Sequence, residues 1–270
     1  MNMRQILGLH QTDGDVGVEI ELETTSRSPL PPDITGDQWR LTRDGSLRGN
    51  SGEYVLRTPA PIERVSGYIA RLRTTLKNSG IPVTYSFRAG VHVHVNVQEL
   101  SLKELVQFAA LYYILENVLV EWCGPDRVGN HFCLRSCDAE RSVDLSSQVI
   151  RERNWYLLEG ATIRYASLNW HSLIQYGSLE FRAMSTKEGL EDVEVWAHML
   201  YNLREKAKEY NSPQEIFLNL SDRGSEDFVL ELVGEENFKL LRGCEDFDYK
   251  IHEGMRLAQD FVFWCGQLET

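Results

Sequence analysis

The sequence predicts an α+β fold: an antiparallel or mixed, curved β-sheet of about six strands with helices packed on one face. The main observation is the order of the patterns. Strand-like segments come first as a cluster, with helical segments inserted between them and then collected at the C-terminal end, which disfavours a parallel doubly wound sheet. No glycine-rich nucleotide loop is present, so a bound nucleotide would have to be held by side chains and metal ions.

Alternation of polar and apolar residues, the period of a strand with one buried face, marks the strand candidates. They span residues 16–23, 38–42, 53–57, 91–97, 162–170 and 178–183. Apolar residues at helical spacing mark the helices. They span residues 62–77, 102–122, 190–210, 225–233 and 253–264. Ser101 followed by Glu104 predicts a capping box at the start of the second helix.

One catalytic domain over residues 1–270 is the simplest organisation, with a strand-rich core at 14–185 and a helical portion at 186–270. No internal repeat, low-complexity tract or long Gly/Ser linker divides the 270 residues. The formal net charge of −12 makes a nucleic-acid duplex an unlikely partner. No apolar run is long enough to predict a membrane span, and the five cysteines, odd in number, fit reduced thiols in the cytoplasm.

Three glutamates alternate along the first predicted strand, where Glu19, Glu21 and Glu23 share one face. On a solvated face, such a row of charges has no functional meaning. On a concave or partly buried face the carboxylates repel one another and must be neutralised by protons, arginine or a divalent cation.

A second strand places His92, His94 and Asn96 on one face against a continuous valine face. Imidazole is a common metal ligand, and the valines indicate that the opposite face is core. Two more strands carry Glu180 with Arg182, and Glu53 with Arg57. Carboxylates suit Mg²⁺ and guanidinium groups suit phosphate or carboxylate oxygens, so this face has the equipment for phosphoryl transfer.

The order of these motifs resembles that of the amidoligase family of phages, bacteria and fungi, within the superfamily of glutamine synthetase and γ-glutamylcysteine synthetase. The resemblance runs roughly over residues 17–182, and the order is more specific than any one motif. The motifs that carry it are Gly17-Val18-Glu19-Ile20-Glu21, Trp39 with Asp44-Gly45-Ser46-Leu47, Glu53, the His92/His94 strand, Arg127 with Asn130 and Cys133, Arg164 with Asn169, and Glu180-Phe181-Arg182. Two departures are Thr58-Pro59 in place of the usual Ser-Pro, and Ala89-Gly90 in place of Cys-Gly.

The resemblance implies a glutamine-synthetase-like catalytic fold and an enzyme that uses ATP and Mg²⁺, or Mn²⁺, to join a carboxylate to an amine through an acyl phosphate. The substrates would be small molecules or peptides, in the cytoplasm, or in the host cytoplasm if the protein is phage-encoded. One metal ion would be held by Glu19, His92 and Glu180, and another by Glu21 and Glu53.

Further roles follow from the same resemblance. Arg164 and Arg182 would neutralise the transferred phosphate, and His92 and His94 would lie near the nucleotide. Asp44 would act near the amine, although Asp-Gly is as often a simple hairpin turn. The predicted substrate contacts are Arg127, Asn130 and Asn169, with a structural loop as the alternative for the first two.

Two other functions stay open. A phosphotransferase of the guanidino-kinase kind could use the same fold without the amine step. A metal-dependent hydrolase, or a metal-binding module without activity, could use the same glutamates and histidines to bind a cation and no nucleotide.

Overall fold

Six strands form one antiparallel sheet in the order β2-β3-β1-β4-β6-β5 in the computed structural model, which describes residues 1–32, 38–84, 86–159, 165–186 and 190–268. Every pair of neighbouring strands is antiparallel. The strands are β1 (Val16–Leu22), β2 (Trp39–Thr42), β3 (Gly52–Leu56), β4 (Gly90–Asn96), β5 (Leu168–Asn169) and β6 (Ser178–Ser185). The expected sheet of about six strands is thereby confirmed, and its pairing is antiparallel rather than mixed.

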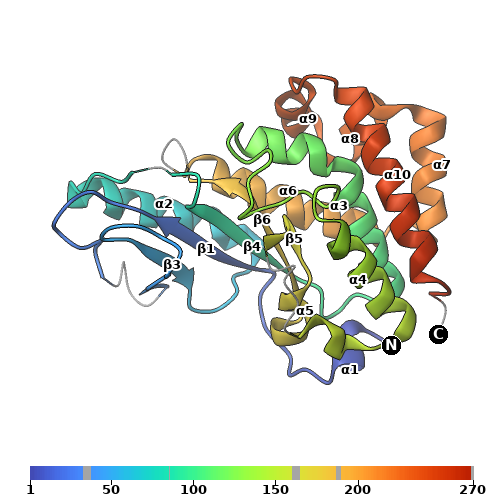
Figure 1. The fold of residues 1–270 in the computed structure, drawn as a ribbon, viewed down its shortest axis with the longest axis horizontal. Coiled ribbons are helices and arrows are strands. Elements are labelled where there is room, and N and C mark those ends of the chain that lie inside the picture. Colours follow the sequence, from blue (N-terminus) through green and yellow to red (C-terminus); the bar gives the residue numbers. More distant parts are fainter. Residues whose placement is uncertain (33–37, 85, 160–164, 187–189, 269–270) are drawn as a thin grey trace.

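Ten α-helices and one short 3-10 helix accompany the sheet in the described part of the chain (Figure 1). They are α1 (Met3–Leu7), α2 (Ile62–Ser79), α3 (Leu102–Cys123), α4 (Glu140–Glu152), η1 (Trp155–Leu158), α5 (His171–Tyr176), α6 (Asp192–Ala207), α7 (Pro213–Arg223), α8 (Ser225–Val233), α9 (Glu235–Arg242) and α10 (Phe247–Cys265). None of the described helices is long and apolar enough to cross a membrane.

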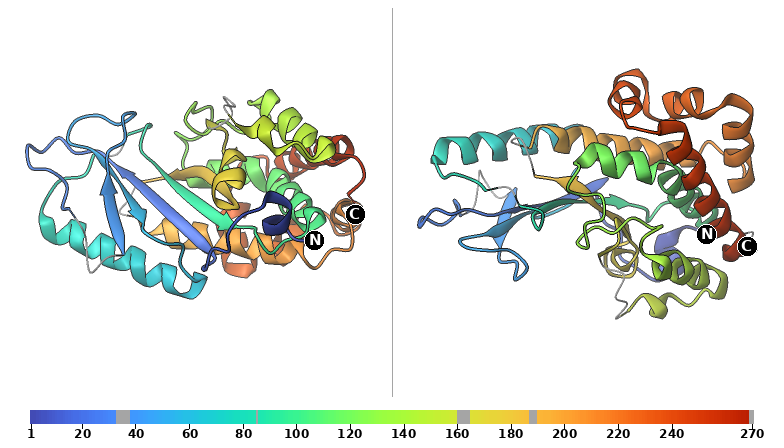
Figure 2. Two further views of the ribbon diagram at one scale, coloured as in Figure 1. Left: turned by 90° about the horizontal axis from the view of Figure 1, so that it is seen from below. Right: turned by 45° about the horizontal axis from the view of Figure 1, so that its top comes forward.

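Three long helices, α2, α3 and α6, lie over one face of the sheet (Figure 2). Helix α3 contacts β6, and α6 contacts β4. The shorter α5 packs against β6 and lies with α4 on the other side of the sheet. The long helices therefore cover the face that carries the apolar side chains. The expectation that the helices pack on one face is wrong for α4 and α5, which lie on the polar side, where α5 packs against β6; the rest of the polar face can form a site.

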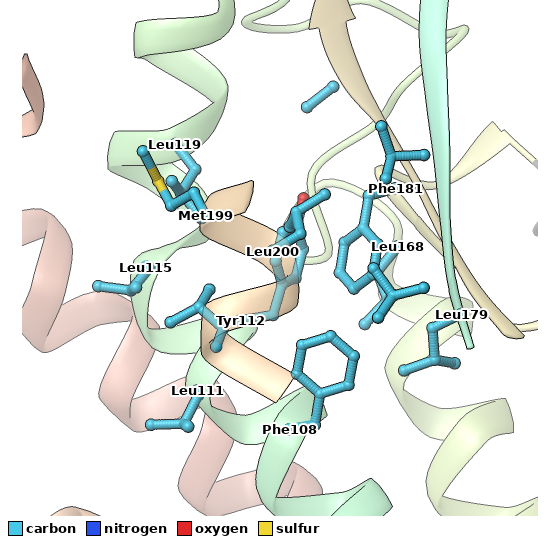
Figure 3. Close-up of a cluster of buried hydrophobic side chains, with 14 of the residues drawn as sticks. Phe108, Leu111, Tyr112, Leu115, Leu119, Leu168, Leu179, Phe181, Met199 and Leu200 are labelled. Carbon is cyan, nitrogen blue, oxygen red and sulfur yellow. The ribbon is translucent and has the colours of Figure 1, made fainter. Parts of the chain in front are cut away.

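The centre of the core lies between α3, α6 and the sheet. Leu111, Leu115 and Leu119 follow one another along α3, and Phe181 of β6 packs against Phe108 and Tyr112 of the same helix (Figure 3). The ring of Phe181 lies 4.8 Å from that of Tyr112, centroid to centroid. Helix α3 is apolar around almost its whole circumference because α10 covers its outer side.

The capping box at Ser101 is confirmed. Its hydroxyl accepts from the backbone N–H of Glu104, and its own N–H donates to the Glu104 carboxylate at 2.7 Å. This reciprocal pair satisfies two N-terminal donors that the helix itself leaves unpaired. The capping box explains why α3 begins at Leu102 as expected.

Several elements differ from the expectation. The strand expected at 162–170 is only Leu168–Asn169 within the described residues, since 160–164 lie outside them. The last helix begins at Phe247 rather than at residue 253. The residue before it, Asp246, has the left-handed backbone conformation and marks the end of the preceding turn. Helices α1, α4, α5, α7 and α9 were not expected. Helices α1 and α5, of five and six residues, are too short for a periodic signal, whereas α4 is amphipathic over 13 residues and its period was overlooked.

Candidate functional site

The polar face of the sheet gathers the glutamates and histidines that the sequence singled out. Along β1, Val18, Ile20 and Leu22 are at most 1% exposed in the apolar core, so the alternate residues point to the other face. Strand pairing then places Glu21 opposite Glu53 of β3, and Glu19 opposite both Val55 of β3 and His92 of β4. On the next pair, His94 of β4 lies opposite Glu180 of β6.

His92 lies at the centre of four carboxylates. Its Nδ1 is 3.2 Å from Oε2 of Glu19, 3.7 Å from Oε1 of Glu180 and 4.0 Å from Oε1 of Glu53. Its Nε2 is 3.9 Å from Oε1 of Glu21. Strands β3, β1, β4 and β6 therefore direct these five side chains into one place.

Glu180 has the most complete set of partners in this cluster. Asn169 Nδ2 and Ser172 Oγ donate to its Oε2 at 2.6 and 2.8 Å, and Arg182 donates to its Oε1. Burial would raise its pKa, but the charges of Arg182, His94 and His92 lower the pKa to about 2. Glu180 is therefore an anion in a fixed orientation.

Glu19 and His94 form a second charged pair. Nε2 of His94 lies 3.4 Å from Oε1 of Glu19. Burial would raise the pKa of Glu19, but its hydrogen bonds to His92 and His94 outweigh burial and lower the pKa. Burial would lower the pKa of His94, yet the charges of Glu180 and Glu19 raise it.

The pKa of Glu53 is shifted upward, in the opposite direction to that of Glu19. Burial and the negative charges of Glu19 and Glu21 raise its pKa to about 7, although Thr42 Oγ1 donates to its Oε2 at 3.1 Å. Glu21 is fixed by the backbone N–H of Gly90, which donates to its Oε2 at 2.7 Å. The cluster therefore brings four carboxylates close together, and the raised pKa of Glu53 reflects its burial and their mutual repulsion.

A cavity of about 660 Å³ opens over this cluster. A second cavity of about 430 Å³ adjoins it, and the two share Glu19, His94, Gln175 and Tyr176. The floor of the second cavity includes Gly17, which has no side chain to fill it. The polar face thus offers space for one large ligand or two smaller ones side by side.

The donor set fits hard divalent cations. Three groups of side chains place one donor atom each within 4.8 Å of the others: Glu19 with His94 and Glu180, Glu19 with Glu53 and His92, and Glu21 with Asp44 and Glu53. Carboxylate oxygens are the donors that Mg²⁺ and Mn²⁺ prefer, and two of the groups add an imidazole nitrogen. His94 thus lies in the group with Glu180, whereas His92 lies with Glu53; their division between two ions stays a prediction.

The predicted substrate residues lie around this site in different ways. Asn169 lines the cavity but turns its amide towards Glu180. Arg127 also lines it, yet is buried and donates to the carbonyls of Ala183 and Arg182 at 2.9 Å each. Asn130 is not among the lining residues; its amide donates to the carbonyl of Phe87 at 2.7 Å. Arg164 lies outside the described residues.

Glu23, the third glutamate of the row, is separated from the cluster. Its Oε1 accepts from the backbone N–H of Arg48 at 2.8 Å, which holds the loop after β2. It follows the last residue of β1 and forms an isolated antiparallel bridge with Thr84.

Several lining residues were missed by the sequence reasoning. Helix α5 contributes His171, Ser172, Gln175 and Tyr176, and its first N–H is bound by Oδ1 of Asn169 at 2.9 Å. The helix is too short for a periodic signal, and an asparagine two residues before His171 was the only available sign. Arg88 and Phe132 come from loops without any regular pattern.

The fold and the site define a protein in which carboxylates and imidazoles gather on one face of an antiparallel sheet. Residues 35–200, more than half of the chain, match the model of the family described as "Putative amidoligase enzyme". The chain belongs to this amidoligase family, and membership supports an enzymatic role. A comparison with curated proteins gives no match.

The residues that match the family model include only part of the site. It includes Glu53, His92 and Glu180, whereas β1 with Glu19 and Glu21 precedes residue 35. The structure ties β1 to the matched part, because β1 pairs with β3 on one side and β4 on the other.

Proposed function

We propose that this protein is an ATP- and Mg²⁺-dependent carboxylate–amine ligase with a glutamine-synthetase-like catalytic fold, which forms an amide bond through an acyl phosphate. The observation that carries the proposal is the gathering of Glu19, Glu21, Glu53 and Glu180 around His92. Such crowding of buried carboxylates is tolerable when divalent cations bind them. Family membership independently supports an amidoligase.

The chemistry requires activation of the acid. A carboxylate does not react with an amine at neutral pH, because its carbonyl is electron-rich and oxide is a poor leaving group. Transfer of the γ-phosphoryl group of ATP to a carboxylate oxygen, with release of ADP, gives an acyl phosphate. Attack by the amine then forms the amide and expels inorganic phosphate. Bound Mg²⁺ would supply positive charge against the phosphate oxygens.

The side chains of the site suit these steps. The charge of Arg182, close to Glu180 and His92, would stabilise negative charge on the transferred phosphoryl group, as would Arg164. The carboxylate of Asp44, in the group with Glu21 and Glu53, would accept a proton from the attacking amine. Asn169 and Ser172 would act indirectly, by keeping Glu180 in place.

The two adjoining cavities suggest where the substrates bind. The smaller cavity borders Glu19 and His94 and is lined by Arg40 and Tyr176, which suits a nucleotide. The group of Glu21, Asp44 and Glu53 lines the larger cavity and not the smaller one, which suits the acid. In this arrangement the phosphoryl group moves between the two ends of the carboxylate cluster.

The test is to incubate the purified protein with ATP, Mg²⁺ or Mn²⁺, and a panel of carboxylic acids and amines. ADP, phosphate and product mass are followed together. Release of both ADP and phosphate that depends on acid and amine, with a product of amide mass, supports the ligase. A stable phosphorylated product would instead indicate a phosphotransferase.

A control separates these enzymes from a metal-dependent hydrolase or a metal-binding module. Thermal stabilisation by ATP in the presence of Mg²⁺, beyond that by Mg²⁺ alone, is expected of a nucleotide-binding enzyme. Cation binding without any response to nucleotide would contradict the proposal.

A further inference from the structure

Three arginines among the described residues line the larger cavity: Arg88, Arg127 and Arg182. In two of them the guanidinium group is paired with a carboxylate or with more than one main-chain carbonyl. Arg182 pairs with Glu180, and Arg127, 1% exposed, donates to the main-chain carbonyls of Ala183 and Arg182. Arg88 is different, because no carboxylate of the described chain pairs with it and its one side-chain hydrogen bond goes to the carbonyl of Ser46, at 3.0 Å.

The guanidinium of Arg88 is nevertheless held in place. Its central carbon lies 5.3 Å from the ring centroid of Phe132 and 5.6 Å from that of Phe87, within the range of cation–π attraction. The backbone N–H of Arg88 donates to Ser86 Oγ at 3.1 Å. Two aromatic rings and one carbonyl thus orient the positive charge without neutralising it.

Ser46 fixes where this charge lies. Its carbonyl accepts from Arg88, while its N–H donates to Oδ1 of Asp44 at 2.6 Å. Asp44 in turn belongs to the group with Glu21 and Glu53. Arg88 is therefore at the end of the cavity that the proposed function gives to the acid, and it does not line the smaller cavity given to the nucleotide.

We propose that Arg88 binds a second anionic group of the acid substrate, apart from the carboxylate that is activated. The inference rests on the proposed function for which end of the cavity takes the acid. A guanidinium matches a carboxylate with two parallel hydrogen bonds, and aromatic packing leaves its donors available. The acid substrate is then a dicarboxylate or an equivalent dianion, and a monocarboxylate of the same length binds more weakly.

The test compares matched acids. Binding of succinate against butyrate, and of glutarate against valerate, is measured by calorimetry with Mg²⁺ and a non-hydrolysable ATP analogue present. For the wild type we expect the diacid to bind about 10-fold or more tightly, the effect of a charge-assisted hydrogen bond. In Arg88→Gln this preference is expected to disappear. The matched control is Arg64→Gln, an exposed arginine of α2, in which the preference is kept.

Loss of Arg88 also removes a contact to Ser46, so the melting temperature and Mn²⁺ affinity of each variant are measured first. Arg88→Lys serves if the glutamine variant does not fold. The lysine ammonium lacks the planar fork, so the preference for the diacid is expected to fall several-fold. An undiminished preference in either folded variant would overturn the inference, as would equal binding of the paired acids by the wild type.

Failure of the inference and failure of the proposed function give different results. A protein that turns over ATP but does not distinguish the paired acids is a ligase in which Arg88 has no such role. A preference for diacids that depends on Arg88, without any consumption of ATP, would support the anion site and contradict the proposed ligase activity.

Discussion

Glu19 of β1 and His92 of β4 are register partners on neighbouring antiparallel strands, with Nδ1 of His92 3.2 Å from Oε2 of Glu19. His92 is 4% exposed, so this pair lies between the core and the cavity. Glu19 belongs to two donor groups, one with His94 and Glu180 and the other with Glu53 and His92, so its carboxylate links the two groups.

Replacing Glu19 or Glu180 with glutamine is expected to abolish ATP turnover while leaving the fold intact. Each substitution removes an anionic donor from the cluster without changing side-chain size, and loss of such a ligand typically costs about 100-fold or more in activity. ADP release and circular dichroism measure the two effects. Glu63→Gln, at an exposed position on α2, is the matched control. Normal turnover in both site variants would exclude this site.

Addition of Mn²⁺ or Mg²⁺ is expected to raise the melting temperature, and chelation by EDTA to reverse it. A ligand that binds only the folded protein at about 100 times its dissociation constant stabilises it by roughly 2.7 kcal/mol. The gain should be smaller in Glu21→Gln, which loses a donor of the group with Asp44 and Glu53. Differential scanning fluorimetry measures it, and equal shifts in the variant and the wild type would contradict a role for this group.

Val93→Ala is expected to destabilise the protein by roughly 2 kcal/mol, because it removes two buried methyl groups and leaves a cavity. Val93 is 0% exposed and lies on the core face of β4. The matched control is Val55→Ala, at a half-buried position beside the smaller cavity, which should cost less than about 1 kcal/mol. Chemical denaturation measures both, and similar losses would show that the two faces of the sheet are wrongly assigned.

Glu116 is expected to make stability depend on pH. It is 1% exposed on α3, where Ser136 and Ser167 donate to it. Burial raises its pKa from 4.5 to about 7 despite these hydrogen bonds. Between these two values the folded protein keeps a proton that the unfolded chain has released, so the free energy of unfolding falls as pH rises, by on the order of 3 kcal/mol in all.

Glu116→Gln tests this dependence, because glutamine does not titrate. The drop in melting temperature between about pH 5 and about pH 8 should shrink relative to the wild type. Glu236→Gln, at a site whose side chain is 90% exposed, should leave the drop unchanged. A drop in Glu116→Gln as large as that of the wild type would show that Glu116 does not titrate in this range.

Gly254→Ala is expected to destabilise the packing of α10 on α3. A Cβ at Gly254 would lie 2.4 Å from the carbonyl oxygen of Ile114 and 2.5 Å from that of Tyr113, so the helices would have to separate. Overpacking of this kind costs about 1–3 kcal/mol. In Gly67→Ala on α2 nothing lies within 4 Å of the added Cβ, and the better helix propensity of alanine should stabilise by up to about 1 kcal/mol.

The sequence predicted the elements whose residues repeat with a clear period. Strand alternation located β1 and β4, because each has one face entirely in the core. It also placed Glu19 and Glu21 on β1, and His92 on β4, away from the apolar core face of each strand, because side chains alternate along a strand. The strand order was not predictable in this way, because pairing between β1 and β4 joins residues far apart in the chain.

Residues that act from loops or short helices were beyond the reach of pattern analysis. Arg88 is oriented by Phe87 and Phe132, and its contact with Phe132 appears only after folding. Arg127 was expected to contact substrate, yet the structure has its guanidinium bound to main-chain carbonyls, and its role towards substrate stays a prediction. A motif identifies the residue type, whereas the partners of each polar atom depend on tertiary packing.

The position of β1 has a consequence for work with shortened forms of this protein. β1 is the first strand in the sequence but lies inside the sheet, bonded to β3 on one side and β4 on the other. A fragment trimmed to residues 35–200 would lack it, and both neighbours would then present unpaired backbone N–H and C=O groups. Such exposed edges recruit strands from other molecules, so the trimmed fragment should aggregate.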